Sequence, residues 1–176
     1  DVMKKATTSA PRDTAGQLTL KIYETQKPII AAINGPAVGA GITMTIPMDI
    51  RYASEDAKIA LAFNRRGLVL DGCCSWFLPR IMGFSNAAEL VYTGRVITAR
   101  EASEYGLISK VLPAEELLPA TKKLAAEIVD NTSAVSTAIS RQMLWQMLGA
   151  NHPMKAHQIE SKALQYLFNS PDLDEG

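Results

Sequence analysis

The sequence has no surplus of either charge, because 18 lysines and arginines balance 18 aspartates and glutamates over 176 residues. Proteins that bind nucleic acid or an anionic membrane normally carry a basic surplus, so this balance gives no electrostatic reason to expect either partner. No apolar run reaches the ~18 residues that a membrane-spanning helix needs. We therefore expect neither nucleic-acid binding nor membrane association.

Residues that form disulfides and metal sites are scarce, since the chain has two cysteines and two histidines. Cys73 and Cys74 are adjacent, which is a poor arrangement for a disulfide and indicates reduced thiols inside a cell. His152 and His157 have no third ligand near them in the sequence. We expect no disulfide, no metal site and a cytoplasmic location.

The periodicity of the apolar residues predicts an α/β protein that is mixed in front and helical behind. A strand, a turn, a helix and a second strand follow one another early in the chain, which favours parallel pairing through a crossover. The predicted strands are 29–33, 49–53, 58–61 and 107–112, and the predicted helices are 14–26, 39–46, 75–82, 85–92, 98–106, 114–131, 133–147 and 154–168.

The segment from Gly35 to Gly41 combines a buried strand end with a glycine-rich helix start. Such a start leaves backbone N–H groups free at the positive end of the helix dipole, and Gly39, Ala40 and Gly41 are small enough to let a ligand approach them. No Lys-Ser or Lys-Thr follows and no GxGxxG pattern is present, so a phosphate loop does not fit. The residues alone leave two interpretations open: a tight strand-to-helix turn, or a site for an anion or developing oxyanion.

Several segments, in a consistent order and spacing, resemble the enoyl-CoA hydratase/isomerase, or crotonase, family. They are Lys27–Gly41 (KPIIAAINGPAVGAG), Asp49–Ala53 (DIRYA), Gly67–Val69 (GLV), Tyr92–Arg95 (YTGR) and Ala102–Ile108 (ASEYGLI). The resemblance implies a crotonase-like spiral of strand-strand-helix units, followed by helices that build a homotrimer or a dimer of trimers. We accordingly assign residues 1–112 to the C-terminal part of the spiral core and residues 113–176 to a helical oligomerisation region. By the same resemblance, the front strands of the family fold precede Asp1.

The family's common chemistry is the polarisation of an acyl-CoA thioester carbonyl by two backbone N–H groups. The resemblance places the second donor at Ala40 and the first at the residue before Asp1. It implies an acyl-CoA substrate, with coenzyme A as part of that substrate and no separate cofactor. Gly39 and Gly41 are then expected to border the bound thioester.

The sequence departs from the family's hydratases at two positions. Their two catalytic glutamates correspond to Thr43 and Phe63 in this chain, and neither side chain is a useful base near neutral pH. Asp71 instead resembles the catalytic aspartate of the family's dienoyl-CoA isomerases and of its ring-opening epoxide and oxepin isomerases. Leu68 and Trp76, together with Phe63 and Thr43, are expected to line the acyl site around it. An alternative is that Asp71 caps the helix that follows.

Three functions follow from this pattern. The first is an enoyl- or dienoyl-CoA isomerase in which Asp71 is the acid/base. The second is an enoyl-CoA hydratase family member that catalyses another reaction. The third is a crotonase-fold protein that binds acyl-CoA or acts as a scaffold without catalysis, which the loss of carboxylates at Thr43 and Phe63 would favour.

Overall fold

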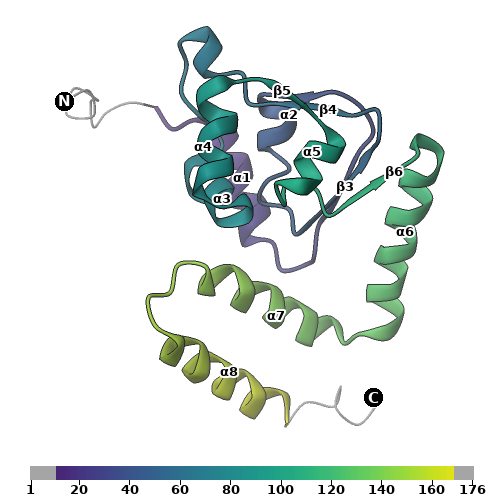
Figure 1. Cartoon of the computed structure of the whole chain (residues 1–176). Coiled ribbons are helices and arrows are strands. Elements are labelled where there is room, and N and C mark those ends of the chain that lie inside the picture. Colours follow the sequence, from purple (N-terminus) through teal and green to yellow (C-terminus); the bar gives the residue numbers. More distant parts are fainter. Residues whose placement is uncertain (1–10, 169–176) are drawn as a thin grey trace.

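The computed structural model describes residues 11–168, and these form two small sheets surrounded by helices (Figure 1). Expectations that concern Asp1 and the residue before it lie outside the described residues. The first sheet has the order β1 (Ile30–Ile33), β3 (Ile50–Ser54), β6 (Lys110–Leu112). The second has the order β2 (Ala37–Val38), β4 (Lys58–Ala60), β5 (Val96–Thr98).

Parallel pairing, which the sequence predicted, is found in both sheets. Strand β1 pairs with β3 from Ile30 opposite Ile50, β3 pairs with β6, and β2 pairs with β4. Only β5 runs antiparallel to its neighbour among the described strands. The chain passes from β1 in one sheet through β2 in the other and back to β3, so the two sheets are wound together by successive crossovers.

The helices agree with the predicted ones in number and order, with small shifts at their ends. They are α1 (Thr14–Glu24), α2 (Ala40–Thr43), the 3₁₀ turn η2 (Asn64–Arg66), α3 (Cys74–Met82), α4 (Phe84–Thr93), α5 (Ala99–Glu104), α6 (Ala114–Asn131), α7 (Ala134–Met147) and α8 (Pro153–Leu167). Helix α5 begins with a capping box: Thr98 Oγ1 accepts the Glu101 N–H at 3.1 Å, and Glu101 Oε2 accepts the Thr98 N–H at 2.8 Å.

Two predicted elements are shorter than expected. The helix expected over 39–46 ends at Thr43, because Pro47 restricts the residue before it and cannot continue a helix. The strand expected over 107–112 begins only at Lys110, since the N–H groups of Leu107 and Ile108 both turn back to the Ala102 carbonyl.

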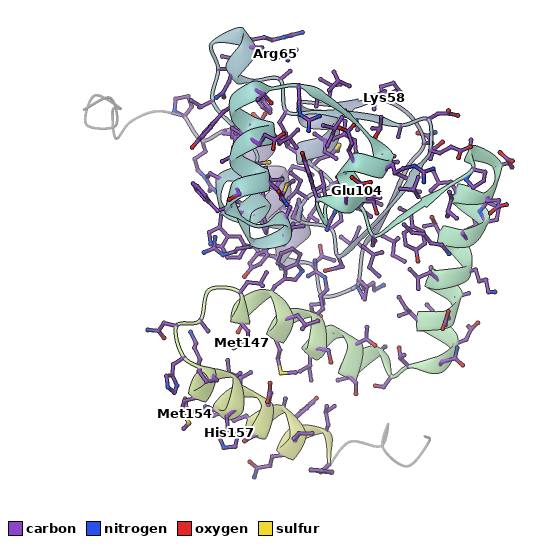
Figure 2. The ribbon with its side chains drawn as sticks, viewed as in Figure 1. Lys58, Arg65, Glu104, Met147, Met154 and His157 are labelled. Atoms are coloured by element: carbon purple, nitrogen blue, oxygen red, sulfur yellow. The ribbon has the colours of Figure 1, made fainter. Side chains whose placement is uncertain are left out.

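The core is formed by α2 to α5 and the two sheets, with fully buried aliphatic side chains from each, such as Ile42, Ile59, Leu78, Leu90 and Ile97. After the core, α6 runs along one side of it. Helix α7 then passes below the core, and α8 lies on the side of α7 that faces away from the core (Figure 1). Met154 and His157 project from this outermost helix (Figure 2). Within the described part of the chain, no helix combines the length and the apolar character required to span a bilayer.

Helix α7 is fastened to the core by a buried ion pair. Arg141 Nε donates to Asp49 Oδ2 at 2.8 Å, and Trp145 Nε1 donates to Asp49 Oδ1 at 2.7 Å. The Trp145 ring also packs edge-on against Tyr23 and Phe77. The first part of the helical region is therefore packed against the body by specific polar and aromatic contacts.

Candidate active site

The turn between β2 and α2 presents two free backbone donors. Gly39 has φ 54° and ψ −122°, a conformation that side chains disfavour, and its own N–H is bound to the Ala60 carbonyl at 3.0 Å. The Gly39 carbonyl accepts from Ile42 and Thr43. Among residues 11–168, the N–H groups of Ala40 and Gly41 meet no acceptor, and both residues are exposed. Free donors at a helix start suit a developing negative charge.

Phe63 borders this turn. A Cβ placed on Gly39 would lie 3.8 Å from Phe63 Cζ, so the ring stands beside the residue that precedes the Ala40 donor. The chain then turns through η2 to Leu68 and Val69, which are 59% and 83% exposed. Apolar side chains are thus left in solvent on the loop that leads from Phe63 toward Asp71.

Thr43 lies on the buried side of α2, and its Oγ1 has no hydrogen-bond partner within the described residues. A Cβ built on Gly72 would be 3.4 Å from both Thr43 Cβ and Thr43 Oγ1, and 3.3 Å from Thr19 Cγ2. The backbone of the loop that carries Asp71 therefore packs directly against α2. Glycine is required at position 72 twice over, by this close approach and by its φ of 61°.

The Asp71 loop is held by an unexpected residue, Asp13. Its carboxylate caps α1 by accepting the N–H groups of Ala15 and Gly16, and its Oδ2 also accepts the Gly72 N–H at 3.0 Å. One side chain thus joins the start of α1 to the backbone next to Asp71. An Asp directly before a predicted helix is a recognisable N-cap signal, so Asp13 could have been found from the sequence.

Asp71 itself is half buried, and its Oδ1 is buried without any hydrogen-bond partner in the described residues. The alternative that its side chain caps α3 is wrong: the N-cap residue is Cys73, and no side chain caps that helix. Asp71 contributes only its backbone carbonyl, which accepts the Cys74 N–H at 3.1 Å. An unpaired buried carboxylate oxygen is costly, so Asp71 Oδ1 needs a hydrogen-bond partner that the described residues do not supply.

The two cysteines beside Asp71 have structural environments. Burial, and to a smaller extent the nearby Asp71 carboxylate, raises the pKa of the Cys74 thiol to about 12. Cys74 is therefore protonated and a poor nucleophile at neutral pH. Cys73 adopts φ 58°, which is unusual for a residue other than glycine and indicates local strain in the loop.

Trp76 contacts a different part of the molecule. Its ring packs against Tyr23 and Phe77, with centroids 6.0 and 4.8 Å away, and the Arg80 guanidinium lies 4.2 Å above it. These contacts join α1 and α3 in the aromatic cluster that reaches α7. The structure therefore brings Gly39, Ala40 and Phe63 together, and it packs Thr43 against the Asp71 loop. The contacts of the Trp76 ring are with the aromatic cluster that joins α1, α3 and α7.

A cavity, Arg65 and His152 are three further features that were compared with the Ala40 turn as places for a ligand. A cavity of about 790 Å³ lies away from Ala40 and Asp71, between the segment 26–30 and helices α6, α7 and α8. Arg65 projects from the tip of the body (Figure 2), with its Nε bound to the Thr93 carbonyl at 2.7 Å. The His152 Nδ1 caps α8, and in the described part of the chain no three His, Cys, Asp or Glu side chains gather as a metal site would require.

Comparison with known proteins gives a match to the enoyl-CoA hydratase/isomerase family over residues 2–176. The chain belongs to the enoyl-CoA hydratase/isomerase family. The family expected from the sequence is thereby confirmed, and so is its α/β crotonase-type fold. A probable enoyl-CoA hydratase/isomerase from Mycobacterium abscessus superposes with a TM-score of 0.89 at 33% identity, covering 97% of this chain and 68% of that one.

Relatives of this family member carry different names. The enoyl-CoA hydratase ACTT3 of Alternaria alternata is 43% identical over 166 residues, covering 94% of this chain and 55% of the relative. The 1,2-epoxyphenylacetyl-CoA isomerase of Escherichia coli is 36% identical over 111 residues, which cover 63% of this chain and 42% of the relative. The chain thus spans about half the length of the curated relatives it matches.

Proposed function

We propose that the protein acts on acyl-CoA thioesters and stabilises an enolate through the Ala40 N–H. Membership of the family and the free donor at Ala40 support this assignment. The companion donor is expected just before Asp1, outside the described residues. Coenzyme A enters as part of the substrate, and we propose no other cofactor.

The observation that carries the proposal is the unpartnered, buried Oδ1 of Asp71. We assign Asp71 as the single acid/base of a double-bond shift. Its carboxylate removes a proton from one carbon of the enoyl or dienoyl chain, and the electron pair moves into the conjugated system to place negative charge on the thioester oxygen. Asp71 exchanges its proton with the solvent and then delivers a proton to a different carbon, so the substrate and product have the same composition.

The side chains at the two neighbouring positions support isomerisation over hydration. Thr43 offers a hydroxyl, and Phe63 offers a ring that cannot move a proton. A double-bond shift needs one proton carrier, whereas the two-carboxylate route to hydration needs two. A scaffold without catalysis is less favoured, because such a protein gains nothing from leaving the Asp71 oxygen unpaired.

Hydration is the second candidate, and the names of the Alternaria alternata relatives favour it. In this case Asp71 alone would activate the water, and the unpaired Thr43 hydroxyl would hold it. The two reactions differ in their balance, since hydration adds one water to the substrate and isomerisation adds nothing.

We further propose that the protein assembles as a homotrimer or a dimer of trimers through the region 113–176. Supporting this, α6, α7 and α8 expose several large apolar side chains, such as Val129, Leu144, Leu164 and Tyr166. The division into a core of residues 1–112 and this helical region is part of the same proposal.

The test is a panel assay of the full-length protein with 2-enoyl, 3-enoyl and dienoyl thioesters, read by NMR and mass spectrometry. The proposal predicts products of unchanged mass with a moved double bond. Products heavier by one water would establish the hydration alternative. Binding of every thioester without turnover of any would overturn the catalytic assignment.

A further inference from the structure

The short helix that carries the Ala40 donor is anchored at both ends. At its start, the Gly39 N–H is bound to the Ala60 carbonyl of β4. After the helix, the N–H groups of Met44, Thr45, Ile46 and Met48 bind carbonyls of the same segment, and Ile42 and Ile46 are fully buried. A helix of four residues cannot hold its orientation alone, so the anchor at its far end matters for the donor.

That far anchor is Arg51 on β3. Its Nη1 donates to the carbonyls of Thr45, at 3.3 Å, of Ile46, at 3.1 Å, and of Met48, and its Nε donates to the Leu107 carbonyl at 2.7 Å. The side chain is buried, and burial lowers its pKa to about 10, an effect that Asp49 partly opposes. The guanidinium is therefore still charged at neutral pH.

We propose that Arg51 is a positioning residue that holds the α2 segment so that the Ala40 N–H stays aimed at the thioester oxygen. This inference rests on the proposed function, because it assigns to Arg51 a task only if Ala40 is the oxyanion donor. The guanidinium donates to the carbonyls at the end of the segment and to the Leu107 carbonyl just after α5, so it connects the two parts of the chain. A displacement of about 1 Å at a catalytic group can cost on the order of 10²-fold in rate.

Arg141 provides a matched control within the same chain. It is likewise buried, and it donates to the carbonyls of Ile22, Tyr23 and Thr25 at the end of α1, with an added ion pair to Asp49. It has the same chemistry as Arg51 but holds a different helix. Loss of stability alone should therefore affect both variants, whereas loss of donor alignment should affect only Arg51.

The experiment compares Arg51→Lys and Arg51→Met with Arg141→Lys in the full-length protein. We expect Arg51→Lys to lower kcat by about 10- to 100-fold with little change in KM, and Arg51→Met to lower it further. Amide hydrogen exchange should accelerate in peptides covering 39–48 in both Arg51 variants. In Arg141→Lys, we expect faster exchange around 22–28 and an unchanged kcat.

Arg51→Lys with wild-type kcat and wild-type exchange over 39–48 would overturn the proposal, and so would an equal loss of kcat in Arg141→Lys. Arg51→Lys retains the charge and carries the test if Arg51→Met does not fold. The exchange measurement also separates this inference from the proposed function. A wild-type protein that turns over no thioester contradicts the function, whereas unchanged exchange in the Arg51 variants contradicts the anchoring.

Discussion

The backbone conformation of Gly39 sets the direction of the Ala40 N–H, the proposed oxyanion donor. A Cβ at this position has room, with Phe63 Cζ 3.8 Å away, but the φ of 54° and ψ of −122° suit only glycine. Gly39→Ala should therefore rotate the peptide that carries the Ala40 N–H. We expect kcat to fall by about 10²-fold, the usual effect of losing one oxyanion donor, with a small change in KM.

Steady-state kinetics on the full-length protein measure this effect. Gly35→Ala is the control, because a Cβ there meets no atom within 4 Å and the residue has no positive φ. Turnover in Gly39→Ala equal to that in Gly35→Ala would mean that the Ala40 N–H is not a donor to the substrate.

Thr43 carries a hydroxyl that is buried without a partner, whereas the Thr19 hydroxyl, also buried, donates to the Gly16 carbonyl at 3.1 Å. An unsatisfied buried polar group costs about 1–3 kcal/mol. We expect Thr43→Val to raise the free energy of unfolding by about 1 kcal/mol and Thr19→Val to lower it by about 1 kcal/mol. Urea denaturation measures both. Destabilisation by Thr43→Val would indicate that the hydroxyl binds an ordered water in the folded protein.

At the residue scale, sequence reasoning could propose Ala40, Thr43, Phe63 and Asp71 as site residues, because a family pattern fixes their spacing. It could not predict that Arg51 joins the end of the α2 segment to the Leu107 carbonyl, since that carbonyl lies 56 residues further along the chain. It proposed Trp76 for the acyl site, which stays a prediction, and it could not predict the contacts of that ring with Tyr23, Phe77 and Arg80. Contacts of this kind depend on tertiary packing, which local patterns do not encode.

At the scale of elements, the capping box of α5 predicts a specific acid response. The bond from the Thr98 N–H, followed by those from Arg95 and the Thr98 hydroxyl, lowers the pKa of Glu101 from 4.5 to about 2. A depressed carboxylate pKa stabilises the folded state above the unfolded value of 4.5, and this stabilisation is lost as the pH falls toward 2. We expect the stability difference between wild type and Glu101→Gln to shrink between pH 5 and pH ~2.5. Denaturation at several pH values measures it, and a difference independent of pH would contradict the role of the charge.

Local sequence patterns predict the ends of some helices better than those of others. The α5 start was predicted to the residue because Thr98 and Glu101 form a local signal. The length of helix α2 was overestimated, because the apolar run continues through Ile46 although the helix ends at Thr43. Pro47 disfavours a helical conformation of the residue before it, which the apolar pattern does not show. The parallel pairing of β1 with β3 was correctly expected, because a crossover joins these two strands, whereas the pairing of β3 with β6 was not predicted from the sequence.

At the scale of the whole molecule, the helices after Pro113 expose apolar side chains that one subunit does not cover. Leu144 on α7 is 73% exposed and Val129 on α6 is 76% exposed. We expect light scattering to find a trimer or a hexamer for the full-length protein, and Leu144→Glu to shift the distribution toward monomer. Ser140→Glu, at an exposed polar position of the same helix, is the comparison with a similar charge. A monomeric wild-type protein at micromolar concentration would contradict the assembly.

The central claim is that Asp71 moves the substrate proton, and isotope exchange with the solvent tests it directly. In D₂O, the full-length wild-type protein should transfer deuterium to the exchanging carbon of an enoyl or dienoyl thioester substrate, followed by NMR. Asp71→Asn preserves the shape but cannot accept a proton, so the exchange rate should fall by about 10²–10⁴-fold while thioester binding remains within a few-fold. Asp56→Asn, at an exposed carboxylate in a turn, should exchange like wild type. Exchange by Asp71→Asn at the wild-type rate would contradict the account.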